Sequence, residues 1–168
     1  MIANLLLCSV TSPVGPITLA LEGDVIVICE FADRDARVAR QLGQYYAGAT
    51  LTKGAAPTHI ARAFQQYFAG DISALETLVS APKGTAFEQS VWQALKDIPA
   101  GATASYGGVA KDLGSSPRAV GRANGRNPVA LLHPCHRVIG ADGNLTGYAG
   151  GLNRKEWLLK HEGALLPL

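Results

Sequence analysis

Residues 105–124 read SYGGVAKDLGSSPRAVGRAN, and this stretch decides how the second half of the chain folds. It predicts a short helix over 105–113 that Gly114 ends, followed at once by a second helix. Ser116 is a good N-cap for the second helix, and Pro117 suits its first position. Two short helices joined by a turn that contains glycine are typical of a helix-turn-helix unit.

The second helix carries arginines at regular spacing. Arg118, Arg122 and Arg126 recur every four residues, so they share one stripe if the helix continues that far. On this helix alone, a solvated basic face is the simpler interpretation. The glycines beside the arginines argue against it, because each costs a helix roughly 1 kcal/mol and such residues usually allow something to approach closely. The stretch 113–137 holds four arginines and no acidic residue, which favours a polyanionic partner.

A cysteine and a histidine, Cys135 and His136, stand side by side in the sequence PCHRVIG at 134–140. They follow a rigid proline, lie in an apolar frame, and are followed at some distance by Glu162. A thiol with a base at hand, and a carboxylate that orients the base, are the parts of an activated sulfur nucleophile. The simpler alternative, which is the default for an isolated Cys-His pair, is a buried and inert cysteine.

Composition limits the classes of protein that this chain can be. Its 168 residues are 48% hydrophobic and 17% charged, enough for one large or two small domains with a buried core. The net charge of +2 is uneven, since residues 1–83 carry −1 and residues 84–168 carry +3. No apolar stretch approaches the ~20 residues that a membrane span requires, so we expect no membrane association.

Three cysteines indicate the compartment. Their odd number and scatter fit reduced thiols in a cytoplasmic protein, and Cys8 and Cys29 have the default interpretation of inert core residues. The sequence contains no pair of cysteines or histidines at the spacing of a zinc site. We therefore predict no metal and no cofactor.

The first half of the chain combines strand and helix signals. β-Branched and apolar runs bounded by turn residues predict an antiparallel sheet, with strands over 2–10, 17–21 and 25–29. Apolar residues at helical spacing predict helices over 33–46 and 58–68, with 48–57 as a loop between them.

A change of character near residue 80 divides the chain. The segment 80–84, SAPKG, is the best linker candidate, and we expect domains at 1–80 and 84–168. Beyond the linker, apolar spacing predicts a helix over 85–96. Another helix is expected over 154–162, ended by a glycine. The predicted fold class is α+β.

Five motifs of the second half resemble those of the O6-alkylguanine-DNA alkyltransferases, also called methylated-DNA–protein-cysteine methyltransferases. They are RAVG at 118–121, NP at 127–128, PCHRV at 134–138, TGY at 146–148 and KEWLLKHEG at 155–163. The resemblance runs through residues 85–168 and is closest to the stand-alone bacterial form. It implies a ribonuclease H-like N-terminal domain and a winged helix-turn-helix-like C-terminal domain.

The resemblance implies DNA repair by direct reversal. Such a protein flips a damaged guanine out of the duplex into a pocket, and its cysteine takes the alkyl group from O6. O4 of thymine is a second candidate substrate. Nothing in the sequence could remove the alkyl group from the thioether product, so one molecule should repair one lesion. The implied partner is double-stranded DNA that contains alkylated guanine, bound in the minor groove by a monomer that can cluster on DNA.

The resemblance also assigns catalytic roles by motif. Cys135 is the acceptor, His136 takes its proton through a water, and Glu162 orients the histidine. Tyr106 presses on the adjoining phosphate and helps to protonate the guanine. Asn127 joins the helix-turn-helix unit to the cysteine segment.

On the DNA side, the resemblance has Arg118 fill the gap that the flipped base leaves, with Arg122 as the fallback because the turn before Arg118 is short. The remaining DNA contacts are expected from Arg126, Ser105, Ala119 and Gly121. The expected pocket residues are Pro134, Val138, Tyr148 and Gly150. His133 departs from the family pattern, since an apolar residue usually precedes Pro-Cys.

Two other functions remain as hypotheses. A protein that binds alkylguanine without repairing it, and marks it for another pathway, would share the DNA-binding features. Relatives of that kind replace the cysteine, which is present here as Cys135. The third hypothesis is a helix-turn-helix regulator whose cysteine is structural.

Overall fold

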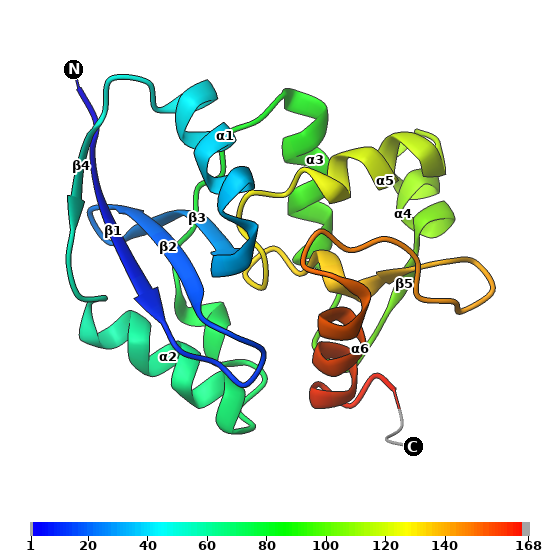
Figure 1. The fold of residues 1–168 in the computed structure, drawn as a ribbon. Coiled ribbons are helices and arrows are strands. Elements are labelled where there is room, and N and C mark those ends of the chain that lie inside the picture. The colour runs from blue at the N-terminus through cyan, green and yellow to red at the C-terminus, as the bar shows by residue number, and fades with distance from the viewer. Residues whose placement is uncertain (1, 166–168) are drawn as a thin grey trace. The chain divides into compact units, whose positions relative to one another are not determined.

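The chain divides into two compact units, Met1–Lys83 and Gly84–Leu168. The first contains a mixed four-stranded sheet. This computed structural model describes residues 2–165. The sheet has the order β3-β2-β1-β4, with β1 at Asn4–Val10, β2 at Ile17–Glu22, β3 at Val25–Phe31 and β4 at Thr50–Lys53 (Figure 1). The first three strands pair antiparallel, as the sequence predicts, whereas β4 runs parallel to β1.

The fourth strand corrects the prediction of a loop over 48–57. All four residues of β4 are exposed, so it lacks the alternation of apolar and polar residues by which a half-buried strand is recognised. Its register on β1 runs from the pair Asn4–Thr50 to the pair Leu7–Lys53. A strand held by its backbone ladder alone leaves no hydrophobic pattern in the sequence.

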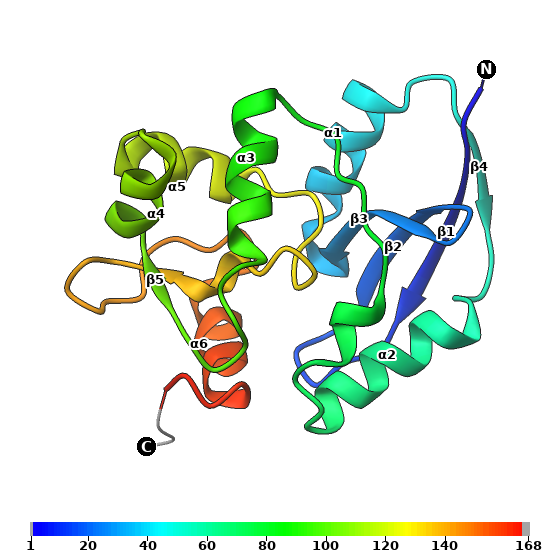
Figure 2. The ribbon, with the colours of Figure 1, turned by 180° about the vertical axis from the view of Figure 1, so that it is seen from behind.

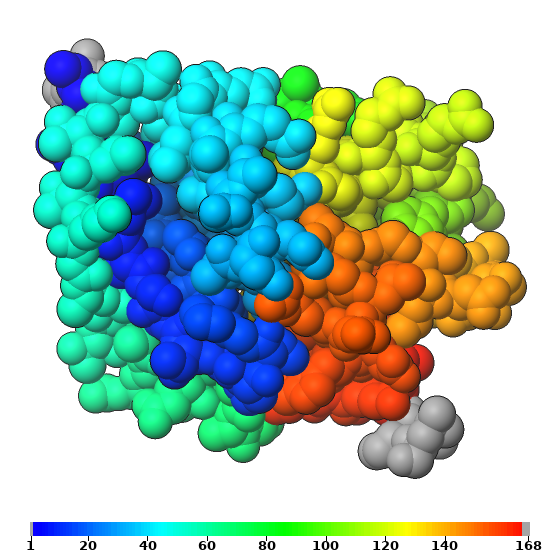
Figure 3. Space-filling model, viewed as in Figure 1, coloured from blue at the N-terminus to red at the C-terminus, as the bar shows by residue number. Residues whose placement is uncertain are grey.

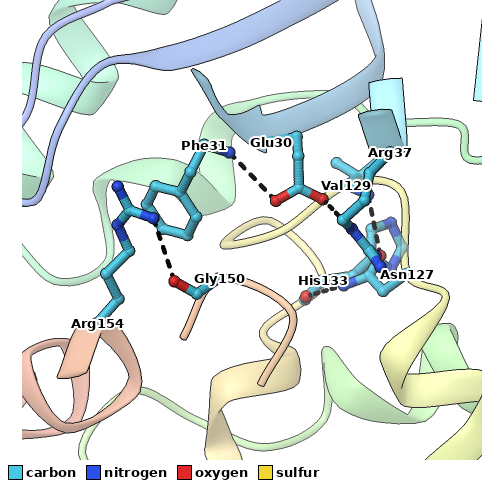
Figure 4. Close-up of polar contacts among 8 residues, drawn as sticks. All are labelled: Glu30, Phe31, Arg37, Asn127, Val129, His133, Gly150 and Arg154. Atoms are coloured by element: carbon cyan, nitrogen blue, oxygen red, sulfur yellow. Dashed lines mark hydrogen bonds and ion pairs between the residues drawn. The ribbon is translucent and has the colours of Figure 1, made fainter. Parts of the chain in front are cut away.

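Helices of the first unit pack on this sheet. They are η1 at Ala32–Arg34, α1 at Asp35–Tyr45, α2 at Thr58–Ala69 and η2 at Ala74–Thr77. The apolar face predicted for α2 is buried through Ile60, Phe64 and Tyr67. Glu30 of β3 is buried, and its carboxylate accepts from Nε of Arg37 at 2.8 Å, which ties α1 to the sheet (Figure 4).

The second unit is mostly helical, as predicted. Its elements are α3 at Ala86–Leu95, β5 at Ala104–Ser105, α4 at Tyr106–Leu113, α5 at Pro117–Gly125, η3 at Cys135–Arg137, β6 at Val138–Ile139 and α6 at Leu152–His161. Both ribbon views show α3, α4 and α5 packed side by side (Figures 1 and 2). The sequence missed the parallel pair β5–β6, because two residues are too few to show a period. Within residues 2–165, no helix has the length and apolar character of a membrane span.

Side-chain caps fix where α3, α4 and α5 begin. Thr85 and Glu88 form a reciprocal capping box at the start of α3, which satisfies two backbone N–H groups at once. Ser105 caps α4, and Ser116 caps α5 as predicted. Gly114 ends α4 in the left-handed conformation, with φ of 64°. These local bonds fix the starts of α4 and α5 and the turn between them.

The glycine before α3 gives a test of packing in this unit. A Cβ atom added to Gly84 would collide with the ring of Trp92, which is buried and donates from Nε1 to the carbonyl of Ala123 at 2.8 Å. Because that ring cannot move freely, Gly84→Ala should lower the free energy of unfolding by about 1–3 kcal/mol in urea denaturation. As a control, Gly43→Ala in α1 meets nothing within 4 Å and should be neutral or stabilise by up to about 1 kcal/mol. Equal effects of the two changes would contradict this packing.

Candidate active site

Cys135 begins the η3 turn and lies at the edge of the core of the second unit. Its side chain belongs to the apolar cluster that also contains Val91, Val109 and Val138, and the residue is 5% exposed. Tyr106 and Tyr148 pack against the same cluster, and Pro134 is buried beside it. The fold therefore brings the predicted nucleophile together with Tyr106, Tyr148 and Val138, three of the predicted catalytic and pocket side chains.

The side chain of His136 is buried and faces the C-terminal end of α6. The residue is fully buried, and its Nε2 lies 3.0 Å from Oε1 of Glu162. Because an ionised carboxylate can only accept, Nε2 must carry a proton in this contact. In a neutral imidazole the other nitrogen, Nδ1, then holds the free lone pair. Neither ring nitrogen makes a hydrogen bond of regular geometry within residues 2–165, but Nδ1 also lacks the close carboxylate contact that Nε2 has with Glu162.

Arg137 is a functional residue that the sequence analysis missed. Its Nε and Nη2 atoms donate to the two carboxylate oxygens of Glu162, both at 2.9 Å, and its Nη1 donates to the carbonyl of Ile98 at 2.7 Å. Such a paired geometry is the strongest form of charge-assisted hydrogen bond. The one available signal was a charged residue inside an otherwise apolar frame.

The protonation states of this triad follow from its contacts. Burial alone would raise the pKa of Glu162, but hydrogen bonds and charge from His136 and Arg137 outweigh it and hold the pKa well below its usual range. Burial lowers the pKa of His136, and the hydrogen bond to Glu162 offsets this only in part. At neutral pH, Arg137 and Glu162 are thus the charged pair and His136 is a neutral base.

A second buried cation near Cys135 is Lys155 of α6. Its Nζ donates to the carbonyl of Val138 at 2.6 Å, and to the carbonyls of Thr146 and Gly147 at 3.0 and 3.2 Å. The residue has no exposed surface. Burial lowers the pKa of Lys155 to about 8, although nearby Cys135 works in the opposite direction. Lys155 therefore fastens the TGY segment to the strand that follows the cysteine.

The TGY segment belongs to a loop between β6 and α6. Residues 141–144 are exposed and stand out at one edge of this unit, drawn in orange in Figure 3. The hydroxyl of Tyr106 donates to the carbonyl of Thr146 at 3.1 Å, and Arg154 donates to the carbonyl of Gly150 at 3.1 Å (Figure 4). Burial raises the pKa of Tyr106, so its hydroxyl keeps its proton. The hydrogen bond from Tyr106 thereby holds the loop at Thr146.

Two asparagines connect α5 to the cysteine segment. The amide of Asn127 donates to the carbonyl of His133 at 2.7 Å and accepts from the backbone N–H of Val129 at 3.0 Å (Figure 4). Asn124, which the sequence analysis did not single out, donates from Nδ2 to the carbonyl of Cys135 at 3.2 Å. Both asparagines are buried. The start of the cysteine turn is therefore fixed to the helix that precedes it.

The arginine helix ends close to its predicted end near Asn124 and does not continue to Arg126. Helix α5 stops at Gly125, so Arg126 is the C-cap residue, and its guanidinium lies 3.7 Å from the carboxylate of Glu88. Arg118 and Arg122 are exposed within the helix, as expected for a basic stripe.

The small residues of α5 have separate surroundings. Ala119 is half-buried, and a Cβ on Gly121 would lie at an ordinary contact distance, 3.8 Å, from the ring of Tyr106. Gly125 has open space beside it. Of the two glycines, only Gly121 thus lies against another side chain.

Possible metal ligands are scattered in this part of the chain. Among residues 2–165, no group of three or more His, Cys, Asp or Glu side chains is placed to hold an ion. The arrangement around Cys135 instead offers a sulfur nucleophile, a neutral base beside it, and two buried cations nearby. Those are the requirements for an attack by thiolate on an electrophile.

Comparison with known proteins gives consistent matches. Residues 86–164 match the family model described as "6-O-methylguanine DNA methyltransferase, DNA binding domain". The chain is 40% identical over 162 residues to the methylated-DNA–protein-cysteine methyltransferase of Shigella flexneri, covering 94% of this chain and 95% of that one. It is 42% identical over 164 residues to the protein of the same name from Mycobacterium tuberculosis, covering 95% and 93%.

Solved structures agree with these relatives. The fold resembles that of Mycobacterium tuberculosis OGT in complex with DNA, with a TM-score of 0.77, 40% identity, and coverage of 95% of this chain and 93% of that one. It also resembles O6-methylguanine-DNA methyltransferase from Pyrococcus kodakaraensis, with a TM-score of 0.70, 28% identity, and coverage of 95% and 99%.

The buried ion pair predicts how stability depends on pH. Glu162→Gln leaves Arg137 buried without its counter-charge, so the free energy of unfolding at pH 7 should fall by about 3–5 kcal/mol. A carboxylate whose pKa is lowered on folding adds stability that is fully present above its unfolded pKa, near 4.5, and is lost as the pH falls through its folded value. The free energies of unfolding of wild type and Glu162→Gln should therefore become more similar as the pH falls below 4.5.

The matched control for this prediction is Glu156→Gln. Glu156 pairs with Lys160 on the same helix at 3.0 Å, but its side chain is 45% exposed. This change should cost about 0–1 kcal/mol, with little dependence on pH. Urea denaturation at pH 7 and pH 4 measures both variants, and a difference for Glu162→Gln that stays constant between these pH values would contradict the ionisation states given above.

Proposed function

Because the chain belongs to the methylated-DNA–protein-cysteine methyltransferase family, we propose that it repairs DNA by direct reversal. An alkyl group on O6 of guanine is transferred to Sγ of Cys135. The thiolate attacks the alkyl carbon, the bond from that carbon to O6 breaks, and guanine leaves as an anion that takes up a proton. The product is a thioether on the protein, so each molecule acts once. O4 of thymine is a second candidate substrate.

The observation that carries this proposal is the buried chain of contacts behind Cys135, in which Arg137 binds the carboxylate of Glu162 and that carboxylate lies 3.0 Å from Nε2 of His136. Because Nε2 of His136 faces the carboxylate of Glu162, the proton of the neutral ring is on Nε2 and Nδ1 is the basic nitrogen. In the proposed step, the proton of the thiol passes to Nδ1, through a water that bridges the two groups. The imidazolium that forms is stabilised by the carboxylate of Glu162, which Arg137 keeps ionised.

The leaving guanine needs a proton donor, because its anion is a poor leaving group in an apolar pocket. Tyr106 is the candidate, since its hydroxyl keeps its proton and the ring packs beside the cluster that contains Cys135. In our proposal Pro134, Val138, Tyr148 and Gly150 form the walls that receive the base. Lys155 supports this arrangement by holding the segment that carries Tyr148.

DNA is the proposed partner of α4 and α5. The exposed guanidinium groups of Arg118 and Arg122 supply charge along one face of α5, and Ser105 and Ala119 lie at the starts of α4 and α5. We infer that this face enters the minor groove and that Arg118 replaces the flipped guanine in the stack. Arg126 contributes less in this arrangement, because its charge already faces Glu88.

Three finer assignments belong to the same proposal. The first unit would have a ribonuclease H-like topology, and the second would be a winged helix-turn-helix carrying both the DNA contacts and the nucleophile. The protein would act as a monomer that can cluster on DNA. Its reduced cysteines favour a cytoplasmic location.

Intact-mass spectrometry tests the reaction. After incubation with duplex DNA that contains O6-methylguanine, the wild-type protein should gain one methyl group, located by peptide mapping on Cys135. Cys135→Ala should bind the same DNA and gain nothing, because no sulfur remains in the pocket. Cys8→Ala, which removes a cysteine of the first unit, should gain the methyl group as wild type does. A methyl group on Cys135→Ala, or none on wild type, would rule out the proposed acceptor; the latter result would favour a protein that only binds the lesion.

The two exposed arginines of α5, Arg118 and Arg122, should respond differently to substitution. Arg118→Ala should slow methyl transfer by roughly tenfold or more while it weakens binding to undamaged DNA much less, because the loss falls on the flipped state. Arg122→Ala should weaken binding to all sequences and reduce the slope of log affinity against log salt by about one. Single-turnover transfer and fluorescence anisotropy at several salt concentrations distinguish these effects. Parallel losses in both assays for Arg118→Ala would make it an ordinary phosphate contact.

A further inference from the structure

The chain before Cys135 contains a strained turn. The backbone N–H of Leu132 donates to the carbonyl of Ala130 at 2.9 Å, which closes a three-residue turn around Leu131. The φ angle of Leu131 is 73°, the one positive value for a residue other than glycine within residues 2–165. A turn of this form is rare and strained. Such strain persists where the surrounding structure over-determines the backbone.

A second three-residue turn follows at once. The backbone N–H of Cys135 donates to the carbonyl of His133 at 2.8 Å, around Pro134 with φ of −78° and ψ of 72°. This is the relaxed, common form of the turn. His133 thus lies between the strained turn and the nucleophile, and whatever holds His133 also positions Cys135.

The ring of His133 is held at the end of α3. The residue is 4% exposed, and its Nδ1 lies 3.0 Å from the carbonyl oxygen of Trp92. Burial lowers the pKa of His133, and the charge of Lys96 lowers it further, against the effect of the hydrogen bond to Trp92. The ring is therefore neutral at pH 7. Because a carbonyl only accepts, the proton of the neutral ring is on Nδ1.

The carbonyl of Trp92 is free for this bond because α3 tightens at its end. The N–H of Lys96, which would bond Trp92 in a regular α-helix, donates to Gln93 at 3.1 Å instead. The indole of Trp92 meanwhile donates to the carbonyl of Ala123 in α5 at 2.8 Å. One residue of α3 is therefore bonded both to the arginine helix and to the segment that carries the nucleophile.

We propose that His133 is a positioning residue for the transfer reaction: its imidazole ties the strained turn to Trp92, and so fixes Cys135 relative to α5. This inference rests on the proposed function for its catalytic consequence. It adds a tether to the one made by Asn127, which holds the backbone of the same segment, whereas His133 holds it through a side chain to a different helix.

Four variants distinguish the effect of the hydrogen bond from His133 to Trp92 from the effect of side-chain volume. His133→Leu removes the donor and keeps a buried apolar side chain. His133→Asn places an amide N–H near the position of Nδ1 and should restore the bond to Trp92. His133→Gln places its amide further out, near the position of Nε2, and should not. His59→Leu, on the exposed face of α2, is the control for the same substitution away from the site.

Single-turnover methyl transfer measures the effect. At saturating DNA, His133→Leu and His133→Gln should lower the transfer rate by roughly ten- to a hundredfold, as expected for a displaced reacting group. The DNA concentration for half-saturation should stay near the wild-type value, because α5 keeps its own anchor on Trp92. His133→Asn should recover most of the rate, and His59→Leu should behave as wild type.

Alkylation of Cys135 by iodoacetamide, followed by mass spectrometry, tests positioning without DNA. Wild type and His133→Asn should react at similar rates, and His133→Gln should react more slowly because Cys135 is displaced from His136. If wild type takes no methyl group from DNA, the proposed function fails. The iodoacetamide rates then still show whether the bond from His133 to Trp92 positions Cys135.

Three outcomes would overturn the inference. His133→Leu could transfer at the wild-type rate, or its rate and its DNA affinity could fall together. His133→Asn could also be no better than His133→Gln in either assay. Should His133→Leu fail to fold, the comparison of Asn with Gln, two polar side chains of the same chemistry, decides the question alone.

Discussion

The ion pair between Arg137 and Glu162 is the interaction on which the rest of the site depends. A fully buried carboxylate would ordinarily bind a proton, because no water stabilises its charge. Two guanidinium bonds of 2.9 Å keep Glu162 ionised, and the same carboxylate lies 3.0 Å from Nε2 of His136. Since Arg137 already neutralises the charge, the imidazole need not be cationic. The pair thus leaves His136 neutral and fixes which of its nitrogens is basic.

The buried charges near Cys135 sum to a net positive charge. Arg137 and Lys155 are buried cations, and Glu162 is the buried anion of the group. Their balance is positive, which favours a thiolate over a thiol. Neither cation is left unsatisfied. Arg137 donates to the Glu162 carboxylate and to one backbone carbonyl, and Lys155 donates to three backbone carbonyls. The contacts that make these charges tolerable in the core also hold the loop, the cysteine turn and α6, so stability and reactivity rest on the same bonds.

Sequence reasoning recovered what is local and missed what is not. The caps at Ser105 and Ser116 act within three residues, and their helices were predicted closely. Arg137 and Lys155 bond groups that are 39 and 17 residues away, so neighbouring residues give no sign of those partners. Strand β4 was missed because its side chains bury nothing. The family resemblance supplied roles for Cys135 and its neighbours, but it could not supply the pair of cations that tune them.

A protein that acts once is free to use arrangements that a turning-over enzyme must restore. The strained turn at Leu131 stores energy that the bonds of Asn127 and His133 must hold only until the sulfur reacts. Before the reaction, the side chain of Cys135, a residue that is 5% exposed, fits its apolar cluster. Afterwards it carries an extra carbon, and overpacking of a close-packed core costs about 1–3 kcal/mol. That cost falls on the segment already under strain, so alkylation should weaken the tie between α5 and Cys135 rather than some remote part of the chain.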